Sequence, residues 1–471
     1  MTYKDKWELL FQDIRFREKT PSIPTDGRNP FENDYGRLIS SSPIRRLQDK
    51  TQVFPLEQSD YIRTRLTHSL EVSYIASSIG QSIENILIEK KEISANKNGY
   101  LSSLLRVSGL IHDLGNPPFG HFGEEAVKKF FRDYFSSDEF LEYQKKIQKQ
   151  NKVDEPILSD LEKSDFLNFD GNVQTLRILS KLYYFGDEYG YNLTYSTLAS
   201  AIKYPSNSID GNKGKEFAEI SKRKFGYFVT EKDTFETINK YLELGNRRSP
   251  IVYLMEAADD IAYSAADIED GIKLNIVNIY EVRKIFENNL TNNKDLVLNE
   301  IDRLITLFEN DQIDESIVIQ KFRIFTQREM IKRIIESFEE NYDSIMNGTL
   351  ESEIIDISAA SDIRKAYKKL QYKVFDDKNI LKKEIAGWEA IYGLLKIMVK
   401  ASRSANFKSG GNTYESRIYK LISSSHRFVY EKIETYENTE YKKLQMITDF
   451  ISGMTDTYAI NLYQELKGIK L

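Results

Sequence analysis

Apolar residues recur at three- and four-residue spacings along most of the 471-residue chain. This period is typical of helices with one buried face, so we expect a mainly α-helical fold. In segment 67–88 the apolar positions at this spacing are Leu70, Tyr74, Ile75, Ile79, Ile83, Ile86 and Leu87. The same pattern predicts helices over residues 101–114, 123–134, 172–185, 194–202, 234–244, 251–270, 279–289, 295–308, 326–346, 385–401, 416–421 and 444–466.

Strand signals are few. The strongest is segment 224–230, Lys-Phe-Gly-Tyr-Phe-Val-Thr, whose aromatic and β-branched residues favour one arm of a short hairpin. Polar stretches at 143–163 and 207–215 are typical of surface excursions from one helical body. We therefore expect three parts, namely an N-terminal segment (1–40), a core (41–275) and a helical C-terminal region packed on that core (276–471).

Composition narrows the class of protein. The 66 basic and 72 acidic residues give a net charge of −6, which argues against a surface built chiefly to coat nucleic acid or anionic lipid. The chain has no cysteine, so a bound metal would be held by histidines and carboxylates. The first residues lack the profile of a signal peptide, and no apolar run reaches the roughly 18 residues that span a bilayer. We expect a cytoplasmic protein without membrane segments.

Two of the four histidines lie in one segment, His-Asp-Leu-Gly-Asn-Pro-Pro-Phe-Gly-His, at positions 112–121. His112 and Asp113 should end the predicted helix 101–114, because the following Asn-Pro-Pro stops a helix. Together with His68 on the preceding helix they would form a mixed nitrogen and oxygen site suited to Mn²⁺, Fe²⁺ or Mg²⁺. A His-Asp pair alone is more often a capping or ion-paired couple, so a further ligand is decisive.

The predicted helix 251–270 supplies acidic candidates for that ligand. Asp259, Tyr263 and Asp267 fall within roughly 80° of one another on one helix face. Most of their neighbours are alanines, which favour close packing and so favour acids that are buried and either ion-paired or metal-bound. A solvated acidic stripe is the alternative. Spacing alone does not separate Asp259 from Asp260 as the metal ligand.

His121 and Glu124 form a second candidate pair, three residues apart across a predicted helix start. In that arrangement the carboxylate can hold the imidazole in one tautomer and support its charged form, as general acid–base chemistry requires. The alternative is a helix-capping histidine with an incidental glutamate nearby. Spacing does not say which proton the histidine would move.

Three segments resemble the signature motifs of the deoxyguanosine triphosphate triphosphohydrolases, a branch of the HD-domain metal-dependent phosphohydrolases. They are His-Ser-Leu-Glu-Val from position 68, residues 112–124, and Leu-Met-Glu-Ala-Ala-Asp-Asp-Ile-Ala-Tyr over 254–263. The resemblance covers about residues 43–272, whereas the last 200 or so residues match only in helical character. It implies an α-helical HD core with a few short strands and a helical C-terminal extension, often assembled as a hexamer. It also implies cleavage of a deoxynucleoside triphosphate to deoxynucleoside and inorganic tripolyphosphate.

The resemblance also implies roles for individual residues. The metal, Mn²⁺ or Mg²⁺, would be held by His68, His112, Asp113 and Asp259, and His121 and Glu124 would be the catalytic pair. The substrate contacts would be Gln52, Arg65, Lys203, Tyr204, Tyr263 and Asp267, with Asn172 a weaker candidate. Of these, the cationic side chains suit a triphosphate. A tyrosine ring against the sugar would exclude a 2′-hydroxyl, and a carboxylate one turn further on could accept from the 3′-hydroxyl.

Several alternatives stay open at this point. No pattern reads guanine uniquely, so the substrate could be dGTP or all four deoxynucleoside triphosphates. A basic segment with Arg417, His426 and Arg427 could bind single-stranded DNA or a nucleotide effector, or could be a solvated helix face. An HD phosphohydrolase acting on another nucleotide would have no use for the Tyr263 face, and a non-catalytic sensor would need neither the metal ligands nor the His121 pair.

Overall fold

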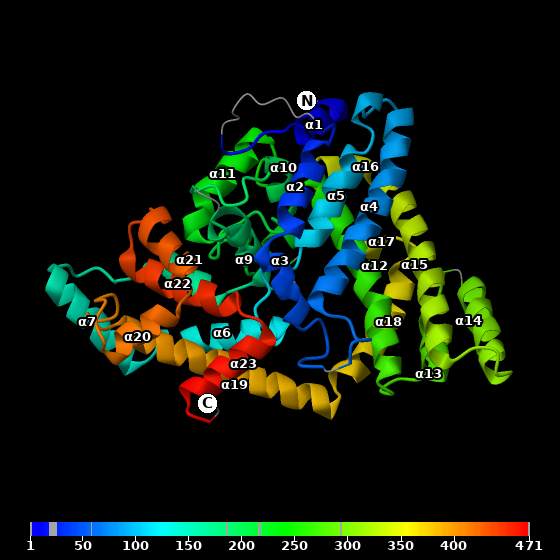
Figure 1. The fold of residues 1–471 in the computed structure, drawn as a ribbon. Helices are drawn as coiled ribbons and strands as arrows, with labels where there is room; N and C mark the ends of the chain where they lie inside the picture. Colours follow the sequence, from blue (N-terminus) through cyan, green and yellow to red (C-terminus); the bar gives the residue numbers. More distant parts are fainter. Residues whose placement is uncertain are drawn as a thin grey trace.

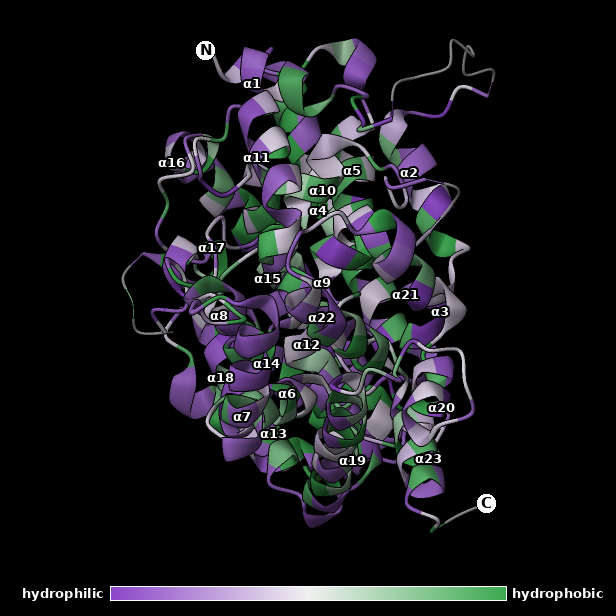
Figure 2. Cartoon of the chain, turned by 90° about the vertical axis from the view of Figure 1, so that its left-hand side faces the viewer, coloured by the Kyte–Doolittle hydropathy of each residue, from purple (hydrophilic) through white to green (hydrophobic). Residues whose placement is uncertain are grey.

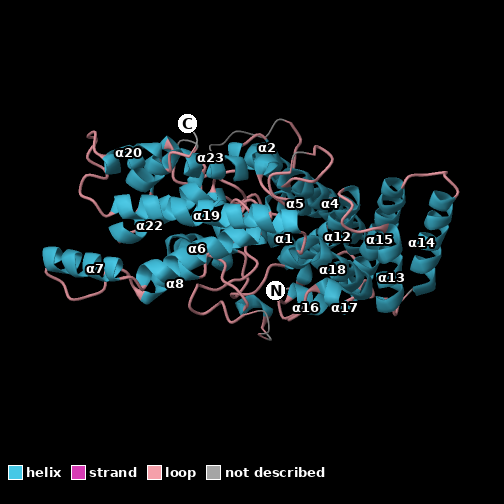
Figure 3. Ribbon diagram, turned by 90° about the horizontal axis from the view of Figure 1, so that it is seen from below, coloured by secondary structure: helices cyan, strands magenta, loops and turns pink. Residues whose placement is uncertain are grey.

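The structure is a computed structural model, and it describes residues 2–17, 26–57, 59–184, 187–214, 217, 219–292 and 294–469. It confirms the predicted mainly α-helical fold (Figure 3). Within the described ranges, β pairing is limited to one bridge between Thr51 and Thr64. The predicted boundaries at positions 185 and 215 lie outside the described residues.

The first half of the chain forms twelve α-helices within the described residues (Figure 1). They are α1 (Tyr3–Leu10), α2 (Pro30–Ile39), α3 (Ser42–Arg46), α4 (Arg65–Glu89), α5 (Tyr100–Ile111), α6 (Gly120–Phe135), α7 (Asp138–Asn151), α8 (Asp160–Leu167), α9 (Gly171–Arg177), α10 (Tyr195–Ser200), α11 (Lys232–Tyr241) and α12 (Pro250–Lys273). A π-helical turn, Ile178–Leu182, continues α9.

The second half adds eleven α-helices within the described residues. They are α13 (Ile279–Asn289), α14 (Lys294–Glu309), α15 (Glu315–Glu340), α16 (Tyr342–Met346), α17 (Ile354–Ile357), α18 (Ser361–Phe375), α19 (Lys378–Ser402), α20 (Tyr414–Leu421), α21 (Ser424–Phe428), α22 (Thr439–Ser452) and α23 (Asp456–Leu466). A second π-helical turn, Val429–Ile433, follows α21.

Two local predictions were wrong. Segment 224–230 is not a strand: the backbone N–H of Gly226 donates to the carbonyl of Ser206, and the aromatic side chains of the segment are buried among helices. The helix predicted over 444–466 is two helices, because the chain turns between α22 and α23 at residues 453–455. The polar stretch 143–163 is mostly exposed and contains parts of α7 and α8.

Helix α12 lies at the centre of the larger apolar core. Nearly all of its residues are buried, and it packs against α4, α5, α15 and α18 (Figure 1). A second apolar cluster joins α6 and α8 to α19, α22 and α23. Seen from below, α13, α14 and α15 form one end of the body, and α7, α20 and α22 lie toward the other (Figure 3). Individual helices carry both hydrophobic and hydrophilic residues (Figure 2), as the periodicity predicts.

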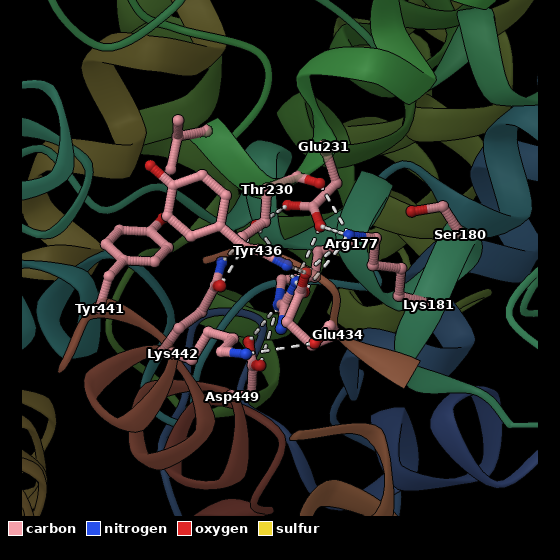
Figure 4. A network of polar contacts seen from close by, with 12 residues as sticks. Arg177, Ser180, Lys181, Thr230, Glu231, Glu434, Tyr436, Tyr441, Lys442 and Asp449 are labelled. Atoms are coloured by element: carbon pink, nitrogen blue, oxygen red, sulfur yellow. Dashed lines mark hydrogen bonds and ion pairs between the residues drawn. The ribbon is translucent and has the colours of Figure 1, made fainter. Parts of the chain in front are cut away.

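A buried ionic network also ties the two halves of the chain together (Figure 4). The guanidinium of Arg177, at the end of α9, lies 2.9 Å from a carboxylate oxygen of Asp449 in α22 and 2.7 Å from one of Glu231. Glu434 lies 3.2 Å from the same guanidinium and also pairs with Lys181. Buried charges of this kind are tolerated only when they are fully paired, so α22 is fixed on α9 by charge as well as by apolar packing.

The division of the chain into three parts, at 40/41 and at 275/276, stays a prediction.

Candidate metal and catalytic site

Three helices bring the predicted metal ligands together. His68 lies in the first turns of α4, His112 caps the C-terminal end of α5, and Asp259 lies midway along α12. One ligand atom from each residue falls within 4.8 Å of the others. Gly109 permits this approach of α5 to α4, because a Cβ there would lie 2.7 Å from the Cα of Ser73.

The geometry of these three side chains fits a divalent cation. Oδ1 of Asp259 lies 3.1 Å from Nε2 of His68 and 3.5 Å from Nε2 of His112. Ligand atoms about 2.0–2.2 Å from one ion have such separations. Nδ1 of His112 lies 2.7 Å from the carbonyl oxygen of Gly109, which leaves Nε2 for the ion. Among the described residues, that Nε2 and Nε2 of His68 are buried without a hydrogen bond of ordinary geometry, as expected for the nitrogens that bind an ion.

Asp113 lies beside this trio and is bound to an arginine. Its Oδ2 is 3.6 Å from Nε2 of His112 and pairs with Nη1 of Arg65. Burial opposes ionisation of Asp113, but His112 and then Arg65 outweigh it and hold the pKa of the carboxyl well below its usual range. Arg65 also donates to the carbonyl of Thr51 at 2.7 Å. The carboxylate is therefore ionised and close to the trio, and its place as a fourth ligand stays a prediction.

The partners of Asp259 and Asp260 favour Asp259 as the metal ligand. Asp260 accepts from Nε of Arg364 at 2.8 Å and from the hydroxyl of Tyr263 at 2.8 Å. Asp259 instead faces His68 and His112. Adjacent helical positions point about 100° apart, so only one of the two acids can reach the histidines.

His121 and Glu124 meet in the first turn of α6. Nδ1 of His121 lies 2.9 Å from Oε2 of Glu124, and Oε1 of Glu124 accepts from the backbone N–H of Gly171 at 2.7 Å. The glutamate is buried, while the imidazole is 85% exposed. The hydrogen bond and then the charge of Glu124 raise the pKa of His121. A fixed carboxylate thus holds an exposed imidazole that can gain or lose a proton.

A cleft of about 700 Å³ joins the two clusters. Seven predicted residues line it: Gln52, Arg65, Asp113, His121, Asp259, Tyr263 and Asp267. Five lining residues from α18 and α19 were not predicted: Lys368, Gln371, Tyr372, Phe375 and Glu384. The apolar spacing of residues 363, 366, 367, 370 and 374 could have indicated α18, although nothing in it pointed to a cleft.

The cleft holds two polar groups suited to a ligand. Oε1 of Gln52 is buried without a hydrogen-bond partner among the described residues. Asp267 accepts from Nε2 of Gln371 at 2.9 Å. Burial and then the neighbouring Asp270 raise the pKa of Asp267 to about 8, so its carboxyl group is largely protonated at neutral pH and can donate as well as accept.

The other predicted binding residues lie apart from the cleft lining. Lys203 is close to Asp259 and Glu256, whose charges outweigh burial and raise its pKa. The side chain of Asn172 donates to Asp170 at 2.7 Å, in the cap of α9. Nδ1 of His426 lies 2.5 Å from Oγ of Ser423, and burial and then nearby arginines lower its pKa to about 4. His426 is therefore neutral at physiological pH and adds no positive charge to its segment.

Comparison with known proteins identifies the family. The HD domain family matches residues 65–181, and the phosphohydrolase-associated domain family matches residues 394–465. A deoxyguanosinetriphosphate triphosphohydrolase-like protein of Listeria innocua is 41% identical over 98% of this chain and 100% of its own. The chain belongs to the deoxyguanosinetriphosphate triphosphohydrolase family. A Synechocystis family member is 30% identical over 99% of this chain and 100% of its own.

Family membership confirms the resemblance seen in the motifs and makes the chain an HD-domain phosphohydrolase. The HD domain is a metal-dependent phosphohydrolase fold, and the trio of His68, His112 and Asp259 is its possible metal site. Among the described residues, no helix combines the length and the apolar character that a membrane span requires.

Loss of either His68 or Asp259 from the metal trio should remove the metal. We expect His68→Ala and Asp259→Ala to retain far less Mn²⁺ than the unsubstituted protein after dialysis, measured by elemental analysis, because two ligands do not replace three. His426→Ala removes a histidine outside the trio and should keep full metal content. Unchanged metal in both site variants would contradict the proposed site.

Proposed function

We propose that this protein hydrolyses deoxynucleoside triphosphates, dGTP by preference, to deoxynucleoside and inorganic tripolyphosphate with a bound divalent cation, Mn²⁺ or Mg²⁺. The observation that carries the proposal is that His121 and Asp259 line one cleft. One member of the metal-ligand trio and one member of the proton-transfer pair therefore face the same substrate-sized space.

The reaction needs both clusters. Water oxygen joins the α-phosphorus as the bond from that phosphorus to the sugar 5′-oxygen breaks, and the leaving oxygen gains a proton. A bound cation would polarise the phosphate oxygens and lower the pKa of the attacking water. His121, held by Glu124, is placed to move a proton at this bond. Because Glu124 is fixed in turn by the N–H of Gly171, the imidazole keeps its orientation through a cycle.

The triphosphate requires cations near the trio. Arg65 lines the cleft with its guanidinium on Asp113, so it can bridge the metal site and an α-phosphate. Lys203 lies close to Asp259 and Asp113, and its raised pKa keeps it charged. With Tyr204 beside it, Lys203 suits the outer phosphates.

The sugar contacts follow α12. Tyr263 and Asp267 line the cleft one and two turns beyond Asp259, and Gln52 lines the same cleft. The ring of Tyr263 is fixed by its hydroxyl on Asp260, so it can exclude a 2′-hydroxyl by contact rather than by a missing partner. Asp267 and Gln52 can then bind the 3′-hydroxyl.

The names of relatives support the substrate class. The deoxyguanosinetriphosphate triphosphohydrolase of Yersinia enterocolitica is 30% identical over 93% of both chains.

A broad specificity for all four deoxynucleoside triphosphates is the alternative. An HD phosphohydrolase acting on another nucleotide is less favoured, because Tyr263 and Asp267 form a wall suited to a deoxyribose. A cytoplasmic location and a nucleotide or single-stranded DNA effector stay predictions from the sequence, and a hexamer stays a prediction from the resemblance.

Product analysis tests the bond that is cleaved. We expect the purified protein with Mn²⁺ to release equal amounts of deoxynucleoside and tripolyphosphate from dGTP, resolved by ion-exchange chromatography. The other three deoxynucleoside triphosphates test base preference, and His68→Ala controls for contaminating phosphatases. Release of pyrophosphate or single phosphate would show that a different bond breaks.

Tyr263 should set the choice of sugar. We expect Tyr263→Ala to narrow the dGTP over GTP preference in kcat/KM by roughly tenfold or more, because the steric block to a 2′-hydroxyl is lost. Tyr263→Phe keeps the ring but loses the bond to Asp260, so it should keep most of the preference. If the alanine variant rejects GTP as strongly as the unsubstituted enzyme, this role is wrong.

Glu124 should set the pH range of the reaction. Its carboxylate raises the pKa of His121, so Glu124→Gln should lower that pKa and move one limb of the kcat against pH profile to lower pH, with roughly tenfold loss at the optimum. A shifted basic limb identifies His121 as the acid, and a shifted acidic limb identifies it as the base. Glu125→Gln alters a neighbouring cleft carboxylate that pairs with Lys128 and should leave both limbs in place. Identical profiles for Glu124→Gln and the unsubstituted enzyme would exclude the pair.

A further inference from the structure

The backbone just before His121 is held in an unfavourable conformation. Phe119 is left-handed, with φ 62° and ψ 20°, and Gly120 follows with φ 54°. A residue with a Cβ rarely adopts this region, because the Cβ crowds its own carbonyl oxygen. Such strain persists only where surrounding contacts over-determine it, and it is commonest at functional sites. The contacts that hold Phe119 therefore decide where α6 begins and where His121 points.

One of these contacts comes from the C-terminal region. Oδ1 of Asp456, the first residue of α23, accepts from the backbone N–H of Phe119 at 3.0 Å. Its Oδ2 accepts from the N–H of Thr51 at 3.0 Å and from the hydroxyl of the same residue. Asp456 is 2% exposed, so these donors have no water to replace it. One carboxylate thus fixes the backbone next to His121 and the backbone next to Gln52.

A second contact comes from α19. Gly387 lies against the ring of Phe119, and a Cβ there would come within 2.4 Å of the ring. The missing side chain makes a notch in α19 that accepts the phenyl group. The ring is 3% exposed and belongs to the second apolar cluster. The notch and the carboxylate hold the side chain and the backbone of the same strained residue.

Lys50 adds a third link between the loop before His121 and the C-terminal region. Its Nζ donates to the carbonyl of Asn116 at 2.6 Å and to the carbonyl of Ser452, the last residue of α22, at 2.9 Å. The loop from Asn116 to Phe119 is therefore tied at both ends to the turn between α22 and α23.

We propose that the C-terminal region completes the active site, with Asp456 and Gly387 acting as positioning residues that hold Phe119 left-handed and so aim His121 at the reacting bond. This rests on the proposed triphosphohydrolase activity. We call the contacts of Asp456 and Gly387 with Phe119 the clasp. The metal trio is carried by α4, α5 and α12, so loss of the clasp should impair proton transfer while leaving metal binding intact.

Two variants and two matched controls test the clasp. Asp456→Ala removes both acceptors, and Gly387→Ala drives a methyl group into the Phe119 ring. Each should lower kcat at least tenfold, with a smaller change in KM and unchanged Mn²⁺ affinity, since a small misplacement of a catalytic group costs rate. Asp456→Asn keeps one carbonyl oxygen and should retain part of the rate.

The controls alter neighbouring contacts that do not reach the loop. Thr457→Ala removes a bond to Asp49. Gly393→Ala inserts a methyl group into the same helix, against the ring of Tyr463 rather than Phe119. Both should keep kcat within twofold of the unsubstituted enzyme, even if thermal stability falls. Unchanged kcat in folded Gly387→Ala, or an equal loss in the controls, would overturn the proposal.

A second readout does not depend on turnover. The chain has four histidines, so the imidazole of His121 can be followed by NMR in Mg²⁺-loaded protein. Loss of the clasp should loosen the bond to Glu124 and lower the pKa of His121 toward the ordinary histidine value in Asp456→Ala and Gly387→Ala only. If the unsubstituted protein cleaves no deoxynucleoside triphosphate, the proposed function fails, and this titration still decides whether the clasp holds His121.

Discussion

The constraint on which the structure depends is the burial of acids along α12. This helix carries Glu256 and Asp259, which are partly buried, and Asp260, Asp267, Glu269 and Asp270, which are buried. Each must be neutralised or paired, because an isolated buried carboxylate is costly. Arg248 pairs with the first, Arg364 with Asp260, and Arg63 with the last two. Asp267 is largely neutral at physiological pH, and Asp259 alone faces two histidines without an arginine.

The compensating groups come from distant parts of the chain, so the site and the fold have a common cause. Arg364 lies in α18 and Arg63 in the turn before α4, and each draws its segment against α12. Gln371 lies two turns of α18 beyond Arg364, so it reaches Asp267 in the cleft. The wall formed by α18 is thus a consequence of pairing Asp260, since the same ion pair that neutralises a buried acid places the residues that face a substrate.

Sequence reasoning predicted what depends on local pattern and failed where distant contacts decide. The period of α4, α5 and α12 and the histidine motifs were enough to bring His68, His112 and an acid of α12 together. They could not choose Asp259 over Asp260, because that choice depends on Arg364, more than 100 positions away. Segment 224–230 has strand-like composition, yet no neighbouring backbone pairs with it as a ladder within the described residues, and Gly226 lets it approach Tyr204 closely. The turn between α22 and α23 likewise depends on distant contacts that no periodicity records: the carbonyl of Ser452 accepts from Lys50, and Asp456 accepts from the backbone N–H of Phe119.

The placement of charge along α12 also gives the cleft a direction. Toward the N-terminal end from Asp259, Glu256 lies beside Lys203 and is paired with Arg248, so cations accumulate there. Toward the C-terminal end, Tyr263 presents an aromatic ring bonded to Asp260, and Asp267 presents a largely neutral carboxyl group bonded to Gln371. Under the proposed function, the phosphates of the substrate would lie toward Lys203 and its sugar toward Asp267. The bond between them would then lie near Asp259, in the cleft that His121 also lines.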